Sequence, residues 1–297
     1  MEARPRIAVV TFPGSNDDRD AAWALGAVGA DPVPVWHADP ELPDVQGVLL
    51  PGGFSYGDYL RCGAIARFAP AMGAVARFAA DGGPVLGICN GFQVLCEARL
   101  LPGVLRPNAS LSFVCRDVRV RVERTDTIFT ARCTQGQELT IPVKCGEGSW
   151  YAEPGKLLEL RQRGQLLLTY ADGNPTGAVE DVAGVLNARG NVLGLMPHPE
   201  HAVDPLLGSG DREPRAQALE VARPERHRPP PRRAARRVRE AHEPLAPVRL
   251  EQLDDRREPL LPRPLGERQP LHEARRAPRC RALAHADDAT AAGVTRP

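Results

Sequence analysis

The sequence predicts an α/β protein with a doubly wound, mostly parallel sheet flanked by helices and with additional antiparallel strands. Two observations lead to this fold class. Short apolar runs alternate with helix-length segments as far as residue 98, which is typical of βαβ units. Glycine-rich turns follow two of these runs directly, and sheets of this kind bind ligands at the carboxyl ends of their strands.

The first expected strand covers residues 6–12, an apolar run rich in β-branched residues. The turn Pro13-Gly14-Ser15-Asn16 then supplies an N-cap for a helix that reaches Ala30. The next expected strands are 32–36, 45–50 and 84–88, and the next expected helices lie within 64–80 and 90–98. A strand followed by a helix recurs along this part of the chain, which favours parallel pairing.

Residues 112–196 contain shorter strand candidates, joined by Gly, Asn and Pro turns. The candidates are 118–122, 138–143, 166–170 and 192–196. We expect these strands to be partly antiparallel and to complete one domain, residues 1–211.

Residues 212–297 differ from the rest of the chain in composition. They contain no Ile, Phe, Tyr, Trp, Met, Lys, Ser or Asn, and 20 Arg stand against 13 acidic residues. Such a segment has little with which to build a core, so a disordered Arg/Pro/Ala-rich tail is one interpretation. A basic arm for nucleic acid or an acidic partner is another. We favour a third, a GC-rich gene read out of frame after about Gly210, because the missing residues mostly have AT-rich codons.

Charge and composition exclude several functions for residues 1–211. This part holds 18 basic against 24 acidic residues, so no electrostatic footprint for nucleic acid is expected. No run approaches the roughly 20 apolar residues of a membrane-spanning helix, and no signal peptide is recognisable, so cytoplasmic localisation is expected. The seven cysteines show neither a disulfide framework nor CxxC zinc spacing, and we expect thiols and no metal site.

The segment from Gly87 to Gln93, GICNGFQ, places Cys89 between glycines where a strand turns into a helix. This is the arrangement of a nucleophile elbow, with Cys in place of Ser. The N-terminus of the helix is expected to favour the thiolate. A lone cysteine is more often a buried structural residue, but the flanking glycines and the strand-to-helix context favour a nucleophile.

A histidine at the end of the last expected strand offers the base that a cysteine nucleophile needs. In MPHPE, His198 stands between prolines, and Glu200 lies on the same side if the segment is extended. Glu200 could then accept a hydrogen bond from one ring nitrogen while the other faces Cys89. An exposed His-Pro-Glu loop is the alternative interpretation. His201 competes as the base, but it is expected to point to the opposite side.

Glycines after the third expected strand, in PGGFSYGDYLR from residue 51, favour an oxyanion hole, which needs two backbone N–H donors. Our choices for these donors are Gly53 and Asn90. The turn lacks the spacing and the Gly-Lys-Ser/Thr of a phosphate-binding loop.

These segments resemble class I glutamine amidotransferases and, within them, the glutaminase subunits of phosphoribosylformylglycinamidine synthase. The Gly-x-Cys-x-Gly and His-Pro-Glu segments mark the superfamily. Further segments resemble the subunits in order and spacing: FPGSN with Asp18-Arg19-Asp20, the block 51–66, Gly146-Glu147-Gly148 and the stretch 190–200. The resemblance covers residues 4 to about 211 and implies a flavodoxin-like sheet.

A thioester mechanism is what the resemblance implies. Cys89 attacks the carboxamide of glutamine, His198 moves the proton to the departing ammonia, and Glu200 orients His198 before water releases glutamate. Gln93 would help to hold the substrate. Ammonia would pass to a synthetase subunit of purine biosynthesis, with a small bridging subunit. ATP and magnesium would belong to that partner, and this subunit would need no cofactor.

The chain departs from the family pattern in two places. Cys145 stands where the family usually has His before the Gly-Glu-Gly turn, and we expect altered pocket or interface contacts rather than lost chemistry. The family also continues past Leu-Leu-Gly-Ser into a short closing helix, whereas this chain departs after Asp211. Loss of that helix would expose apolar surface and reduce a stability margin that is typically only about 5–15 kcal/mol.

Three other functions are weighed against this one. A stand-alone cysteine hydrolase or peptidase would need the same elbow and base, but the block 54–63 is specific to the subunit. A non-catalytic binding module usually lacks the Cys or the His, and both are present. Nucleic-acid binding through residues 212–297 is the third.

Overall fold

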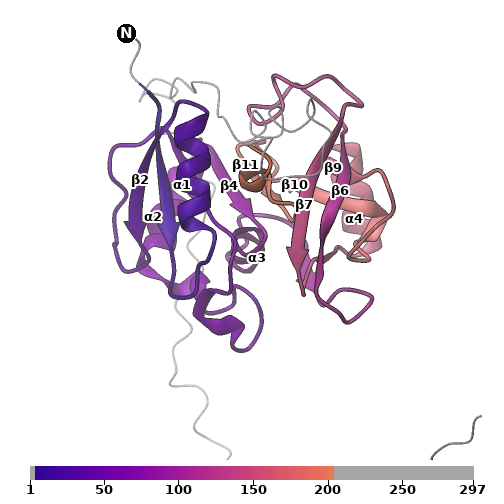
Figure 1. Ribbon diagram of the computed structural model, residues 1–297, viewed down its shortest axis with the longest axis horizontal. Helices are drawn as coiled ribbons and strands as arrows, with labels where there is room; N and C mark the ends of the chain where they lie inside the picture. The colour runs from indigo at the N-terminus through magenta and orange to yellow at the C-terminus, as the bar shows by residue number, and fades with distance from the viewer. Residues whose placement is uncertain (1–3, 204–297) are drawn as a thin grey trace, which may run out of the picture. The chain divides into compact units, whose positions relative to one another are not determined.

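The computed structural model describes residues 4–203, which form a nine-stranded sheet, a two-stranded sheet and flanking helices. The strand order of the large sheet is β2-β1-β3-β4-β11-β10-β9-β6-β7 (Figure 1). Pairing is parallel from β2 to β11 and antiparallel from β11 to β7. The predicted fold class is confirmed. The predicted domain boundary at 211 and the predicted tail 212–297 lie outside the described residues.

The parallel half of the sheet consists of β1 (Arg6–Thr11), β2 (Asp31–Trp36), β3 (Gly47–Leu50), β4 (Val85–Ile88) and β11 (Val192–Leu195). Every residue of β3, β4 and β11 is buried, as their continuous apolar sequences require. The edge strand β2 carries Pro32 and Pro34, which cannot donate a ladder hydrogen bond and are tolerated at an edge. Because β3, β4 and β11 are buried along their whole length, the residues that follow their carboxyl ends start from rigid strands.

The helices of this half are α1 (Asp18–Ala27), α2 (Pro70–Ala80) and α3 (Asn90–Glu97). Helix α1 ends at Ala27, three residues before the predicted end at Ala30. The helix cannot continue because Gly29 adopts a φ of +83°, in the left-handed region. Helix α2 begins at Pro70, whose fixed φ suits the first helical position. Short 3₁₀ segments lie at Ser55–Asp58, Ala66–Phe68, Val179–Asp181 and Pro199–His201.

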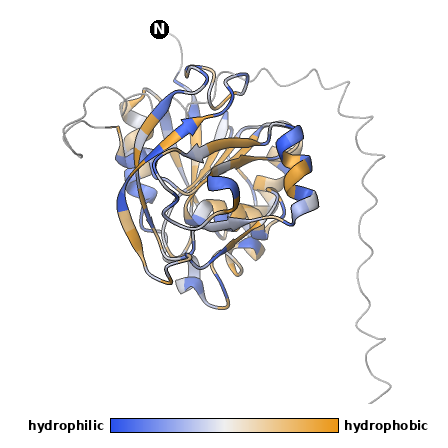
Figure 2. Cartoon of the chain, turned by 90° about the vertical axis from the view of Figure 1, so that its right-hand side faces the viewer, coloured by the Kyte–Doolittle hydropathy of each residue, from blue (hydrophilic) through white to orange (hydrophobic). Residues whose placement is uncertain are grey.

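The antiparallel half contains β6 (Val114–Val122), β7 (Glu138–Cys145), β9 (Leu166–Tyr170) and β10 (Val182–Leu186). Buried and more exposed residues alternate along β7 and the second half of β6, so one face of these strands packs on the core. Figure 2 shows this alternation as hydrophobic and hydrophilic colours along the strands that face the viewer.

Four elements were not predicted: β10, α4 (Pro154–Gln162), and the paired strands β5 (Val104–Arg106) and β8 (Ser149–Tyr151). Three-residue strands are too short to show a period. Helix α4 buries only Leu157 and Leu160, and β10 carries Gly184 in its interior, so neither has the expected composition.

Packing between β4, β11 and α3 forms the part of the core nearest the predicted site. Phe92 of α3 is fully buried, and a Cβ built on Gly194 of β11 would lie 2.1 Å from its ring. Gly194 thus provides the space into which Phe92 packs. Among residues 4–203, no helix is both long and apolar enough to cross a membrane.

Candidate active site

Cys89 occupies the sharp turn between β4 and α3. Its φ of +49° and ψ of −104° are strained for a residue with a side chain. The turn also requires glycine on both sides, since a Cβ on Gly91 would lie 2.0 Å from the backbone oxygen of Leu50, and one on Gly87 would lie 2.7 Å from that of Gly91. The predicted strand-to-helix elbow is therefore present, and its small neighbours are a steric requirement.

The charge state of Cys89 is subject to opposing effects. Burial raises its pKa well above the usual value, and the nearby carboxylates of Asp17 and Glu200 raise it further. The backbone N–H of Asn90 acts in the opposite direction. Desolvation of the thiol thus acts against the thiolate that the helix N-terminus is expected to favour. The sulfur of Cys89 lies 3.6 Å from the backbone oxygen of Lys144, which can accept the thiol proton. A raised pKa means that Cys89 needs a base to become nucleophilic.

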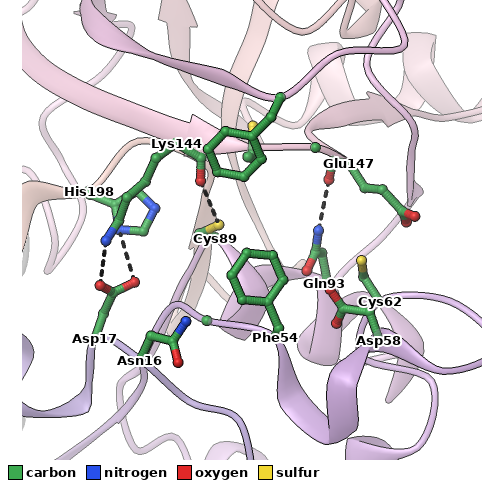
Figure 3. Close-up of a pocket in the computed structure, with 14 residues that line it drawn as sticks. Asn16, Asp17, Phe54, Asp58, Cys62, Cys89, Gln93, Lys144, Glu147 and His198 are labelled. Carbon is green, nitrogen blue, oxygen red and sulfur yellow. Dashed lines mark hydrogen bonds and ion pairs between the residues drawn. The ribbon is translucent and has the colours of Figure 1, made fainter.

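His198 lies beside Cys89 because their two strands are neighbours. β4 and β11 pair in parallel with Ile88 opposite Leu195, so the residues that follow each strand meet at one edge of the sheet. The Nδ1 atom of His198 is 2.6 Å from Oε1 of Glu200, and both side chains are buried. Its Nε2 atom is also buried, without a hydrogen-bond partner among the described residues, and Figure 3 shows it on the side of the ring that faces Cys89.

The segment after His198 is not extended, as the prediction assumed, because residues Pro199–His201 form a 3₁₀ turn. Glu200 still reaches His198, but His201 now turns toward the same cluster. Its Nε2 atom lies 3.3 Å from Oδ1 of Asp17 and 3.7 Å from Oε1 of Glu200. The expected opposite orientation of His201 is therefore wrong, since strand alternation does not apply to a turn.

The two predicted oxyanion donors flank the elbow. Gly53 adopts a φ of +138° and a Cβ on it would lie 2.5 Å from the backbone nitrogen of Asn16, so only glycine fits. No acceptor for its N–H occurs among the described residues, whereas the next N–H, of Phe54, donates to Gly14. The N–H of Asn90 is directed at the Cys89 sulfur. Both donors are thus placed near a carbonyl that Cys89 would attack.

The side chains of Asn90 and Gln93 join the elbow to neighbouring turns. Nδ2 of Asn90 donates to Oε1 of Gln93 at 2.9 Å, and its Oδ1 accepts from the backbone N–H of Ser55 at 3.2 Å. Nε2 of Gln93 donates to the backbone oxygen of Glu147 at 2.8 Å. Gln93 lines the cavity, as a substrate contact requires, but its amide is already engaged with protein atoms at both ends.

A cavity of about 210 Å³ opens in front of Cys89 (Figure 3). Its lining includes Cys89, His198 and Gly53. The end remote from His198 carries the carboxylates of Asp58 and Glu147 (Figure 3). Burial raises the pKa of Asp58, and the neighbouring charge of Glu147 adds to this effect. This end of the cavity therefore favours a cationic group of a ligand.

Asp17 and Lys144 are two pocket residues that the sequence interpretation did not identify. Nζ of Lys144 lies 2.5 Å from Oδ1 of Asp17. Ligand atoms of Asp17, His198, Glu200 and His201 lie within 4.8 Å of one another, a spacing that a divalent ion could also use. We assign no metal here, because the Lys144 ammonium already balances Asp17, and the short distance from His198 to Glu200 is that of a hydrogen bond.

Cys145, the departure from the family pattern, lies buried in the lining of this cavity. Burial raises its pKa to about 12, so it is a neutral thiol. Its sulfur is 3.9 Å from Oδ1 of Asn108. The position belongs to the pocket and not to the group formed by Cys89, His198 and Glu200.

The chain is similar over most of its described length to known proteins. The model of the CobB/CobQ-like glutamine amidotransferase domain matches residues 4–220. The phosphoribosylformylglycinamidine synthase subunit PurQ of Rubrobacter xylanophilus is 60% identical over 206 residues, which are 69% of this chain and 93% of that protein. The same subunit of Frankia casuarinae is 56% identical over 205 residues, covering 69% of this chain and 88% of the relative.

A solved structure agrees with these matches. A chain of the PurLQS structure from Thermotoga maritima has a TM-score of 0.67 at 41% identity, covering 74% of this chain and 98% of that chain. The similarity therefore extends from the sequence to the arrangement of the whole fold. From the family match, the relatives and the elbow geometry together, we conclude that the chain belongs to the CobB/CobQ-like glutamine amidotransferase family.

Proposed function

We propose that this chain is the glutaminase subunit of phosphoribosylformylglycinamidine synthase, with Cys89, His198 and Glu200 as its catalytic triad. One observation carries the proposal. Cys89 at the end of β4 and His198 at the end of β11 face one cavity, and Glu200 engages the remote ring nitrogen of His198 at 2.6 Å. The relatives that are 60% and 56% identical supply the particular synthase.

The reaction proceeds through a thioester. His198 takes the thiol proton of Cys89 at Nε2 while the sulfur attacks the side-chain carboxamide carbon of glutamine. The negative oxygen that forms accepts hydrogen bonds from the N–H groups of Gly53 and Asn90. The carbon–nitrogen bond then breaks, and His198 returns the proton to the departing ammonia. A water molecule hydrolyses the thioester and releases glutamate.

The acidic end of the cavity is suited to bind the α-ammonium group of glutamine. Glutamine carries an α-ammonium group, and the carboxylates of Asp58 and Glu147 lie opposite the nucleophile end. Binding of the ammonium relieves the repulsion between the two carboxylates. Gln93 completes this wall of the cavity and holds the turn around Glu147 in place.

The remaining assignments follow from this function. Ammonia passes to an ATP-dependent synthetase subunit, with a small bridging subunit, in the synthesis of purines, and ATP and magnesium belong to that partner. The solved relative is a PurLQS assembly, which supports such a complex. We further propose that the amidotransferase domain ends near residue 211, that this subunit holds no cofactor of its own, and that it acts in the cytoplasm.

Glutamate release by the complex with the synthetase and bridging subunits tests the proposal. Cys89→Ala should abolish glutamine-dependent amidine formation and leave the ammonia-dependent reaction of the same complex intact. Cys96→Ala is the matched control, because Cys96 is another buried thiol of α3 that does not line the cavity. Glutaminase activity that survives Cys89→Ala would show that another residue is the nucleophile. Activity that is the same with and without the partner subunits would favour a stand-alone hydrolase.

A further inference from the structure

Asp17 stands at the N-cap of α1, but it does not cap the helix. Its side chain makes no hydrogen bond to the first N–H groups of α1, although Asp is among the preferred capping residues. Only 3% of the residue is exposed. A buried carboxylate that gives up a local partner must be stabilised elsewhere.

That stabilisation comes from the proposed active site. Oδ1 of Asp17 accepts from Nζ of Lys144 at 2.5 Å, and Nε2 of His201 is 3.3 Å away. Oδ2 lies 3.7 Å from Nδ1 of His198 (Figure 3). The same nitrogen is 2.6 Å from Oε1 of Glu200. Partners from β7 and from the turn after β11 thus converge on one carboxylate, and they hold its pKa far below the usual range despite burial.

Gly52 provides the space for this arrangement. A Cβ at this position would lie 2.3 Å from Oδ2 of Asp17 and 2.7 Å from Cε1 of His198. Both side chains therefore pack against the bare backbone at the end of β3, which fixes their separation. The contact is a packed feature of the site and not an incidental ion pair.

We propose that Asp17 is a second positioning carboxylate for His198 and that Lys144 counterbalances its charge. The inference rests on the proposed function and adds two residues to it. Asp17, whose Oδ2 is 3.7 Å from Nδ1 of His198, favours the protonated ring that forms when Cys89 attacks. Lys144 limits this effect, so that His198 can still release the proton to ammonia.

The charges around His198 come from four parts of the chain. The groups facing it or its immediate partners are Asp17 and Asp20 at the start of α1, Cys89 of the elbow, Lys144 and Cys145 of β7, and Glu200 and His201 of the 3₁₀ turn. Among these residues, Asp17 and Lys144 form the one direct carboxylate–ammonium pair. Removing one member of this pair changes the net charge beside His198 in a defined direction.

Opposite shifts of the pH profile are the signature of this arrangement. In Asp17→Asn a negative charge is lost, which disfavours the imidazolium and favours the thiolate, so the pH–activity profile should move to lower pH by about 1 unit. In Lys144→Met the Asp17 charge is uncompensated, and the profile should move to higher pH. The double variant Asp17→Asn/Lys144→Met should resemble Asp17→Asn, because Lys144 acts through Asp17.

The experiment measures kcat and kcat/KM for glutamate release against pH in the complex with the synthetase and bridging subunits. Lys156→Met and Asp172→Asn, on exposed ion pairs, serve as matched controls and should keep the wild-type profile. Lys144→Arg keeps the positive charge and should therefore show the wild-type pH profile. The ammonia-dependent reaction of each complex shows whether the synthetase subunit is intact. Melting temperatures identify variants that fail to fold. If a single variant does not fold, the pH profile of the double variant Asp17→Asn/Lys144→Met tests the proposal instead.

Unshifted profiles in both single variants, or shifts in the same direction, overturn the inference. A lower kcat with an unchanged profile also overturns it, because that result shows a merely structural role. Failure of the proposed function looks different: the wild-type complex then shows no glutaminase activity that depends on Cys89. Shifts of opposite sign in the two single variants, together with a double variant whose profile matches that of Asp17→Asn, establish Asp17 and Lys144 as parts of the acid–base apparatus.

Discussion

Gly52 leaves room for the side chains of Asp17 and His198 because it has no side chain of its own. In Gly52→Ala the new methyl group overlaps both side chains, at 2.3 Å and 2.7 Å, so one of them must move. A displacement of about 1 Å at a proton-transfer site can cost about 100-fold in rate. We expect a loss of that order in glutamine-dependent kcat/KM, with the ammonia-dependent reaction unchanged.

Gly26→Ala is the matched control for this substitution. Gly26 is exposed on α1, has no other atoms within 4 Å of an added Cβ, and lies in a helix, where Ala is preferred. The control should keep full activity and gain about 0.5–1 kcal/mol in unfolding free energy. Equal activity in both variants would contradict the steric account of Gly52.

His201 makes stability depend on pH. Its pKa is raised above 6.5, mainly by the hydrogen bond to Asp17, so the folded state binds a proton more tightly than the unfolded state. This contribution is fully present below about pH 6.5 and is lost as the pH rises through the raised pKa of His201. Urea denaturation across that range should show a falling unfolding free energy, and His201→Gln should show a flatter dependence. If His201→Gln leaves the pH dependence of the unfolding free energy unchanged, the proton responsible for it binds to another residue.

At the residue scale, local patterns were informative and long-range contacts were not. Cys89 with its glycines and the pair His198 and Glu200 could be located from sequence, because each signal lies within a few neighbouring residues. Asp17 could not, because an Asp before a helix is normally explained as a cap and Lys144 is 127 positions away. His201 was misplaced because nothing in HPEHA distinguishes a turn from an extended strand.

Phe92 is the largest of the fully buried side chains by which helix α3 packs on the sheet. Phe92→Ala removes a fully buried ring from the space above Gly194, and the cavity should cost about 3–5 kcal/mol of unfolding free energy. Since α3 begins next to Cys89, activity should fall with stability. Chemical denaturation of the isolated chain measures the change.

An exposed phenylalanine provides the comparison. Phe68 is 73% exposed, and the guanidinium of Arg67 lies 4.3 Å above its ring. Phe68→Ala should therefore cost less than about 1 kcal/mol. A similar loss in both variants would show that α3 does not depend on the Phe92 contact.

Elements with a strong period or an uninterrupted apolar run could be predicted, and their ends moved by only a few residues. β1, β3 and β4 are of this kind, because burial on both faces of the sheet selects continuous apolar sequences. Helix α4 and strand β10 could not be predicted, because tertiary packing holds them together and their local composition does not.

Residues 212–297 stand where the family resemblance predicts a short closing helix. If the expected closing helix packs on the sheet in the family, replacing residues 212–297 by the C-terminal segment of the Rubrobacter relative should raise the melting temperature and the glutaminase activity. A chain that ends at residue 211 is the control, because it lacks both segments. Equal melting temperatures for the three chains would show that the closing helix contributes nothing.

The fold class of the whole molecule could be predicted, but the order of the antiparallel strands in the sheet could not. Alternating strands and helices indicated the parallel half, and the short strand candidates within residues 112–196 indicated extra antiparallel strands. That β6, β7, β9 and β10 extend the same sheet depends on pairings between distant segments, such as β6 with β9. No local pattern specifies which of several antiparallel strands lie side by side.

The pairing of β4 with β11 also sets the order in which function is acquired during synthesis. The ribosome completes the elbow around Cys89 more than a hundred residues before His198, and at about 5–20 residues per second the interval is roughly 5–20 seconds. Throughout that interval Cys89 is present in the nascent chain but its proposed base, His198, is not. Glutamine hydrolysis can therefore begin only when β11 has inserted beside β4, so that the last strand of the described fold completes the machinery that releases ammonia.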